Sequence, residues 1–211
     1  WRTVTGTLLT GEAYLYTGGL VVASGWGQEL AMWDAADNFG CSVGTAGDVN
    51  GDGYADVVVG ACGDPAFGYV GKAYVFFGNA SWSNYVDWTL SLWRTDYFGA
   101  AVGTAGDVNG DGYADLLVGA PGDYLSVTGG RAYVYFGGAS PDTVADLTLA
   151  GAAAGDGFGG AVAAAGDVNG DGYDDVVVGA NGNDAGGAGA GRAYVYFGGP
   201  AMDATADVVL T

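Results

Sequence analysis

The sequence contains no histidine and a single lysine, Lys72. Histidine is the commonest general base in enzymes and the commonest transition-metal ligand, so its absence excludes Ser-His-Asp and Cys-His catalytic systems. Basic residues are scarce in general, because five Lys and Arg stand against 24 Asp and Glu, for a formal net charge of −19. Such a surface repels polyanions, so we expect neither nucleic acid nor an anionic lipid surface as a partner.

Proline and long apolar runs are also lacking. With only four prolines, and with 43 glycines that follow no three-residue period, the chain is not a collagen. No stretch approaches the ~18 apolar residues of a membrane span and no basic-then-apolar leader is present, so we expect no membrane insertion. Half of the residues are hydrophobic and 14% are charged, which excludes intrinsic disorder. Because the chain starts at Trp1 rather than Met, we expect an upstream segment to have been removed or left out.

The most informative feature of the sequence is an internal repeat. The segment Asp-Val-Asn-Gly-Asp-Gly-Tyr-x-Asp begins at Asp48, Asp107 and Asp167. A Phe-Gly pair precedes each copy, and an apolar run that ends in Gly-Ala follows it. A third element, Gly-[Lys/Arg]-Ala-Tyr-Val, begins at Gly71, Gly130 and Gly191. The first 38 residues carry only the back half of this pattern, because Gly11-Glu-Ala-Tyr-Leu-Tyr matches the third element.

The repeat pattern predicts the domain organisation. We expect the C-terminal half of a repeat at 1–38 and complete repeats at 39–97, 98–157 and 158–211, together forming one propeller or a segment of one. Each repeat contains four short β-type runs, expected in the first repeat at 39–47, 56–61, 72–77 and 87–92. The second and third runs are apolar on both faces, so neighbouring sheets must cover both. The prediction is an all-β fold of β-propeller blades, each a four-stranded antiparallel sheet, with three complete repeats after a half repeat.

The nine-residue segment has the spacing of a calcium loop. It places side-chain oxygens at positions 1, 3, 5 and 9 and a backbone carbonyl at position 7, which in the first copy are Asp48, Asn50, Asp52, Asp56 and Tyr54. Calcium is a hard cation that takes six to eight oxygen ligands, and a glycine at position 6 allows the chain to turn around it. The alternative is that Asp, Asn and Gly only form a tight turn. Three copies favour the metal interpretation, with three calcium ions.

A repeated aspartate before each Phe-Gly pair leaves two interpretations open. Asp37, Asp96 and Asp156 occupy this position. They can cap a turn, or they can add ligands or substrate contacts. We favour the capping role.

Together these elements resemble the FG-GAP repeat of integrin α-subunit propellers and many bacterial surface proteins. The resemblance rests on Phe-Gly, the Asp-x-Asn-Gly-Asp-Gly-x-x-Asp loop and the Gly-Ala-Pro at 119–121. It implies a seven-bladed propeller with calcium in the loop between the first two strands of a blade. The ligands implied here, including three tyrosine carbonyls, are Asp48, Asn50, Asp52, Tyr54, Asp56, Asp107, Asn109, Asp111, Tyr113, Asp115, Asp167, Asn169, Asp171, Tyr173 and Asp175.

The sequence departs from the family pattern in two ways. The Gly-Ala-Pro ending is Gly-Ala-Cys at Cys62 and Gly-Ala-Asn at Asn181. Three and a half repeats also cannot close a seven-bladed ring, and two chains would leave two half repeats without their first two strands. Either those strands lie upstream in a longer chain, or the half repeat pairs edge-on with another molecule.

The two cysteines stand at matching ends of the first hairpin. In an antiparallel hairpin centred on the calcium loop, Cys41 and Cys62 are expected to be nearly opposite, within reach of a disulfide. We expect this disulfide; the alternative is two buried free thiols. A disulfide and calcium loops of millimolar affinity both indicate an extracellular or cell-surface location.

Three classes of function remain after these exclusions. The sequence favours a non-enzymatic calcium-binding module for adhesion or protein recognition. The alternative is a structural subunit whose open ends join into an extracellular filament or surface layer. An enzyme is disfavoured because no acidic cluster lies outside the loops and turns. The expected partner is therefore a protein ligand or further copies of the chain, either as a homo-oligomer or as a fragment of a longer propeller.

Overall fold

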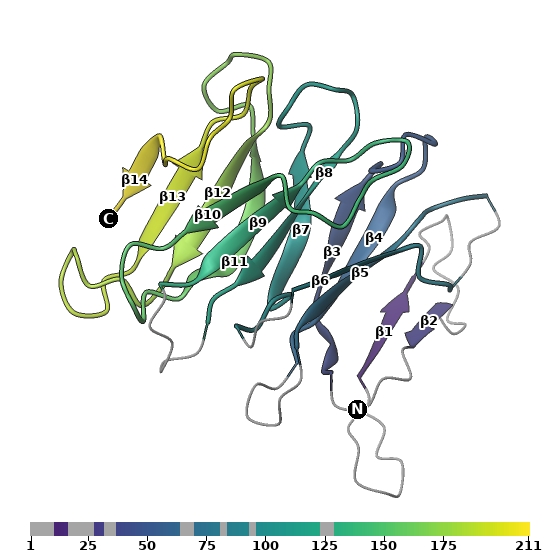
Figure 1. Cartoon of the computed structure of the whole chain (residues 1–211), viewed down its shortest axis with the longest axis horizontal. Helices are drawn as coiled ribbons and strands as arrows, with labels where there is room; N and C mark the ends of the chain where they lie inside the picture. Colours follow the sequence, from purple (N-terminus) through teal and green to yellow (C-terminus); the bar gives the residue numbers. More distant parts are fainter. Residues whose placement is uncertain are drawn as a thin grey trace, which may run out of the picture.

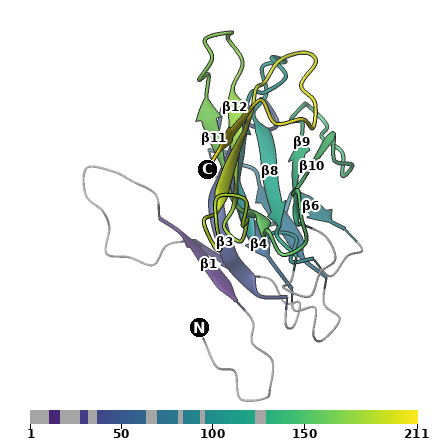
Figure 2. The same ribbon diagram turned by 90° about the vertical axis from the view of Figure 1, so that its left-hand side faces the viewer.

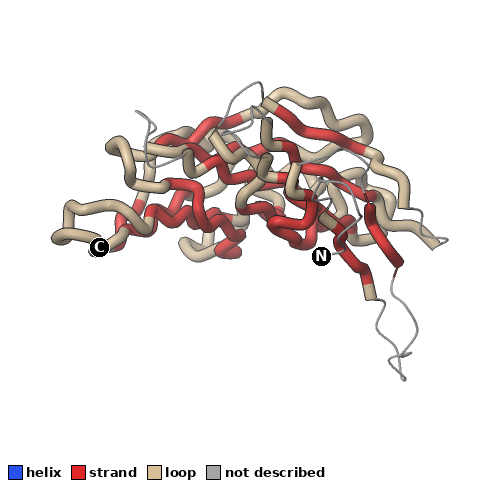
Figure 3. Tube along the Cα trace, turned by 90° about the horizontal axis from the view of Figure 1, so that it is seen from below, coloured by secondary structure: helices blue, strands red, loops and turns tan. Residues whose placement is uncertain are grey.

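Every regular element in the described part of the chain is a β-strand. The computed structural model describes residues 11–16, 28–31, 37–63, 70–80, 84–92, 96–122 and 129–211. Viewed from below, these residues form strands joined by loops and turns (Figure 3). They include no helix of the length and apolar character that crossing a membrane requires.

The strands form three four-stranded sheets and one two-stranded half sheet, all antiparallel. Sheet I comprises β3 (Phe39–Gly47), β4 (Asp56–Ala61), β5 (Lys72–Phe76) and β6 (Trp88–Ser91). Sheet II comprises β7 (Ala101–Gly106), β8 (Asp115–Ala120), β9 (Arg131–Tyr135) and β10 (Leu147–Ala150). Sheet III comprises β11 (Phe158–Gly166), β12 (Asp175–Ala180), β13 (Arg192–Tyr196) and β14 (Val208–Leu210). The half sheet comprises β1 (Glu12–Leu15) and β2 (Gln28–Ala31).

The sheets follow one another in chain order like the blades of a propeller. In Figure 1 the half sheet lies on the right, sheets I and II in the middle, and sheet III on the left. The first strands β3, β7 and β11 contact their neighbours along the series. Figure 2 views the molecule from the sheet III end. The predicted all-β fold of propeller blades, three complete and one half, is confirmed.

Both faces of a strand are buried where sheets lie on both sides of it. In sheet II, Leu116 and Val118 of β8 pack against sheet I, whereas Leu117 packs against sheet III, and all three are fully buried. Phe98, from the Phe-Gly pair, lies 5.6 Å from the Tyr133 ring (centroid to centroid) in the same interior. This arrangement explains why the second and third strands of each repeat do not alternate between apolar and polar residues.

The strand boundaries agree closely with the prediction, but the register of the first hairpin differs from it. The strands expected at 39–47 and 56–61 begin and end at those residues. A β-bulge, however, separates the pair Phe39–Ala61 from the pair Ser42–Gly60. Cys41 therefore lies in the bulge and has no direct cross-strand partner. Gly40 supplies the backbone conformation that the bulge needs, with a φ of 84°.

Candidate metal centres

The three predicted loops join the first strand to the second in each four-stranded sheet. In the first loop both carboxylate oxygens of Asp48 accept backbone N–H groups, from Asp52 at 3.0 Å and from Gly53 at 2.8 Å. The side-chain oxygen of Asn50 accepts the Asp52 N–H at 2.9 Å, and Asp52 in turn accepts the Tyr54 N–H at 2.9 Å. The oxygens at positions 1, 3 and 5 are therefore held by the backbone of their own loop. Gly53 has a φ of 88°, as the turn requires.

The second and third loops repeat this geometry closely. In the second, Asp107 accepts the N–H groups of Asp111 at 3.1 Å and Gly112 at 2.9 Å. In the third, Asp167 accepts those of Asp171 at 3.1 Å and Gly172 at 2.9 Å. Equal sequences thus give equal local structures in three different tertiary surroundings.

The aspartate at position 9 has a different environment from the others. Asp56 is almost fully buried; one of its oxygens accepts the Val49 N–H at 2.9 Å and the other the Gly78 N–H at 2.7 Å. The matching Asp115 is fully buried and accepts N–H groups from Val108 and from Gly137, two residues beyond the end of β9. These carboxylates tie the loop to the end of the third strand.

Burial has an electrostatic consequence at these carboxylates. It raises the pKa of Asp115 to about 7 and raises that of Asp56 as well, against the opposing effect of the backbone N–H groups that they accept. The sequence assigned these residues only a ligand role. The spacing of the motif does not indicate that the aspartate at position 9 is also buried and joins the loop to a segment beyond the third strand.

Adjacent loops are hydrogen-bonded to each other across the sheet boundaries. The carbonyl of Asp48 accepts the Ala114 N–H at 3.0 Å, and the carbonyl of Asp107 accepts the Asp174 N–H at 3.2 Å. The Asp174 carboxylate also accepts the Asp107 N–H at 2.9 Å. The three candidate metal loops therefore form a continuous row along one edge of the molecule.

The chemistry of the donor set fits a hard divalent cation. Each loop offers three carboxylates, one amide oxygen and one backbone carbonyl, and it offers no nitrogen or sulfur ligand. Across the part of the chain that the structure describes, no three Asp, Glu, Cys or His side chains are grouped as a metal cluster. The loops thus contain suitable ligands, and their oxygens are engaged by backbone N–H groups.

Two of the three aspartates before the Phe-Gly pairs make capping contacts, which the favoured interpretation expects. Asp37 accepts the Phe39 N–H at 3.2 Å, and Asp156 accepts the Ala153 N–H at 3.0 Å. A second set of capping aspartates was missed in the sequence. Asp87, Asp146 and Asp207 each accept the N–H of the residue after the third strand, at 2.7–2.8 Å. The sequence feature that indicates them is the aspartate that recurs directly before the fourth strand of each sheet.

The cysteines are neighbours in the structure. The Cys62 N–H donates to the sulfur of Cys41 at 3.0 Å. Cys41 is exposed and Cys62 is half-buried, so the alternative of two buried thiols does not describe the pair. The Cys41–Cys62 disulfide remains a prediction.

Comparison with known proteins identifies the repeat. The FG-GAP repeat model matches residues 39–76, 98–135 and 158–196, which together make up more than half of the chain. Mouse integrin alpha-IIb is 33% identical over 199 residues, covering 87% of this chain and 18% of that protein. Human integrin alpha-6 is 39% identical over 111 residues, covering 50% of this chain and 9% of that protein.

A relative outside the integrins also matches. Human phosphatidylinositol-glycan-specific phospholipase D is 32% identical over 173 residues, covering 75% of this chain and 20% of that protein. The chain thus spans a fifth or less of the length of each of these three relatives. Each of the three segments matched by the family model begins at a Phe-Gly pair and runs through the loop and the Gly-Ala element to the end of the third strand of its sheet. The chain belongs to the FG-GAP repeat family.

Proposed function

We propose that the chain is a calcium-stabilised, non-enzymatic FG-GAP module that recognises a protein ligand outside the cell or at its surface. The observation that carries the proposal is the row of three loops with the same all-oxygen donor set, linked edge to edge by backbone hydrogen bonds. The integrin relatives support a recognition role, and the phospholipase relative matches over only 20% of its length. Catalysis is disfavoured because the whole sequence lacks histidine.

The ions would be held by the fifteen loop positions that the sequence predicts. Calcium supplies positive charge that offsets the repulsion among the three carboxylates of each loop. The chain's own contribution is to fix the loop backbone: Gly53 and its equivalents allow the turn, and the buried Asp56, Asp115 and Asp175 anchor the loop to the third strand. An extracellular location agrees with calcium affinities of about 10⁻⁴–10⁻³ M.

The test is calcium stoichiometry together with thermal stability. We expect isothermal titration calorimetry to find three calcium ions per chain. We also expect excess chelator to lower the melting temperature, because an ion that binds only the folded state stabilises it by about 2.7 kcal/mol per site at 100 times its Kd. The variant Asp111→Asn removes one exposed ligand charge from the second loop and should bind two ions.

The matched control is Asp142→Asn, which removes a charge from an exposed aspartate outside the loops. It should still bind three ions and melt like the wild type in calcium. A wild-type melting temperature that chelator leaves unchanged would refute the calcium proposal. If Asp142→Asn lost an ion as Asp111→Asn does, general charge rather than the loop would explain the binding.

A further inference from the structure

The first and second loops have the same nine residues, and each contacts the loop that follows it. At both contacts the carbonyl at position 2 accepts an N–H from the segment after the third strand of the next sheet, at 2.7–2.8 Å. The glycine at position 4 also lies against the tyrosine ring of the next loop in both cases. The contacts differ at position 8 of the following loop, which is Ala114 after the first loop and Asp174 after the second.

Asp174 binds the backbone of the second loop on both sides of one ligand residue. Its N–H donates to the carbonyl of Asp107 at 3.2 Å, and its carboxylate accepts the Asp107 N–H at 2.9 Å. In the first loop the carbonyl of Asp48 accepts the Ala114 N–H at 3.0 Å, but an alanine side chain offers no acceptor for the N–H of Asp48. The aspartate at position 1 is therefore held more firmly in the second loop than in the first.

A glycine directly before each loop makes room for the residue at position 8. A Cβ on Gly106 would overlap the carboxylate of Asp174, and a Cβ on Gly47 would overlap the Cβ of Ala114. The two glycines have nearly the same backbone conformation, with φ of 81° and 80°. Because the recess is alike at both contacts, the side chain at position 8 is what distinguishes them.

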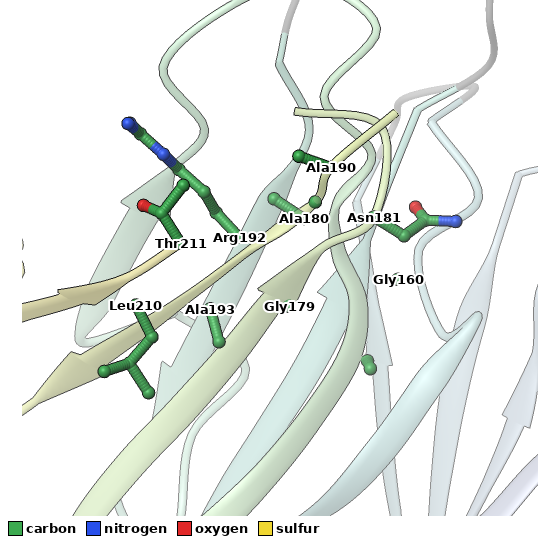
Figure 4. A pocket seen from close by; sticks show the side chains of 11 residues that line it. Gly160, Gly179, Ala180, Asn181, Ala190, Arg192, Ala193, Leu210 and Thr211 are labelled. Carbon is green, nitrogen blue, oxygen red and sulfur yellow. The ribbon is translucent and has the colours of Figure 1, made fainter. Parts of the chain in front are cut away.

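Asp174 also places a further negative charge beside the three carboxylates of the second loop. The basic residues in the described part of the chain lie at the opposite end of the sheets, where each begins a third strand: Lys72, Arg131 and Arg192. Arg192 pairs with Ala180, the last residue of β12, and lines with it and with Gly179 a groove of about 530 Å³ (Figure 4). Charges within about 8 Å of each other are only partly screened at physiological salt, so the carboxylate of Asp174 favours a cation in the second loop.

We propose that Asp174 is a positioning residue that makes the second loop bind calcium more tightly than the first. It fixes the backbone of Asp107, whose carboxylate is the first ligand, and it adds negative charge beside the site. The ligands of the two loops are identical, so a difference in affinity has to come from outside the loop. The inference rests on the proposed function, because it needs calcium in these loops, and it goes further by ranking two of the sites.

The test is a calcium titration followed by nuclear magnetic resonance, with the backbone amides of Gly53 and Gly112 reporting the first and second loops. In the wild type, we expect the second loop to reach half-saturation at a calcium concentration at least about threefold lower than the first, the size of effect that one further charge at a partly exposed site produces. Asp174→Ala should weaken the second loop to the affinity of the first and leave the first unchanged. Ala114→Asp, which gives the first loop the same neighbour, should tighten it by about the same factor.

Two further variants separate positioning from charge. Asp174→Asn keeps a side-chain oxygen that can accept the Asp107 N–H but removes the charge, so it should retain part of the difference that Asp174→Ala abolishes. Asp142→Asn, at an exposed aspartate outside the loops, should leave both affinities as in the wild type. A readout without calcium tests the hydrogen bond itself: in chelator, the amide of Asp107 should exchange with solvent faster in Asp174→Ala than in the wild type or in Asp142→Asn.

Three results would overturn the inference while leaving the calcium proposal intact. The first is a wild-type protein in which the first and second loops fill together. The second is an Asp174→Ala variant that weakens both loops equally, which indicates a general loss of charge or of folded protein. The third is an Ala114→Asp variant that leaves the affinity of the first loop unchanged. Absence of calcium from all three loops would instead refute the proposed function, and this inference with it.

Discussion

At the scale of single residues, the aspartates of one motif do two different things. Those at positions 1 and 5 lie at the surface of the loop, where their oxygens accept N–H groups from exposed turns, as Asp107 and Asp111 do. The aspartate at position 9 is buried and ties the loop to another strand, as Asp115 does. Substitutions of the two kinds of aspartate should therefore differ in whether the loss of stability occurs only when calcium is present.

We predict that Asp115→Ala lowers the free energy of unfolding by about 2–4 kcal/mol, because it leaves the buried N–H groups of Val108 and Gly137 without an acceptor. The loss should be present in calcium and should persist in chelator. Urea denaturation under both conditions measures it.

The comparison variants for this prediction are Asp111→Ala and Asp142→Ala. Asp111→Ala should be less stable than wild type mainly when calcium is present. Asp142→Ala, a change at an exposed residue, should stay within about 0.5 kcal/mol of wild type in both conditions. If Asp115→Ala were destabilised only when calcium is present, the aspartate at position 9 would be a ligand without the structural role assigned to it.

At the scale of strands and hairpins, the sequence predicted most of what the structure contains, because its repeats and apolar runs are local signals. The strands at 39–47 and 56–61 were located to the residue. The bulge at Gly40 and Cys41 was not foreseen, because it depends on how the backbone of the hairpin meets the next element, where Gly40 packs against the Glu12 carbonyl. The buried role of Asp56 was missed for the same reason: Gly78, its partner, is distant in sequence.

The glycine of the second strand provides a prediction at this scale, because one substitution can be compared in two equivalent strands. Gly119→Val in β8 would drive its side chain into the Gly159 carbonyl of sheet III, and we expect a loss of about 3 kcal/mol or more in the free energy of unfolding. Gly179→Val in β12 faces the open groove, where valine suits a strand better than glycine, and should be neutral or stabilising. Equal losses for the two variants in thermal and urea unfolding of the monomer would contradict the packing described here.

At the scale of the whole molecule, the sheets are nearly identical in sequence and unequal in their surroundings. Sheet II has a complete sheet on each side, sheet I has one complete sheet and the half sheet, and sheet III has one neighbour in the described structure. In a linear array of repeats, the stability of each unit is approximately its intrinsic stability plus the contribution of the interfaces with its neighbours. The sheets should therefore differ in local stability although their sequences barely differ.

Hydrogen exchange followed by mass spectrometry measures this difference directly. We predict the slowest exchange in β8 and β9 of sheet II, intermediate exchange in β4 and β5 of sheet I, and the fastest exchange among the three in β12 and β13 of sheet III. Because the matching strands have almost the same sequence, their intrinsic exchange rates nearly cancel, and the order reports neighbours alone. Equal protection in all three sheets would mean that the array unfolds as one cooperative unit and that its open face costs it no local stability.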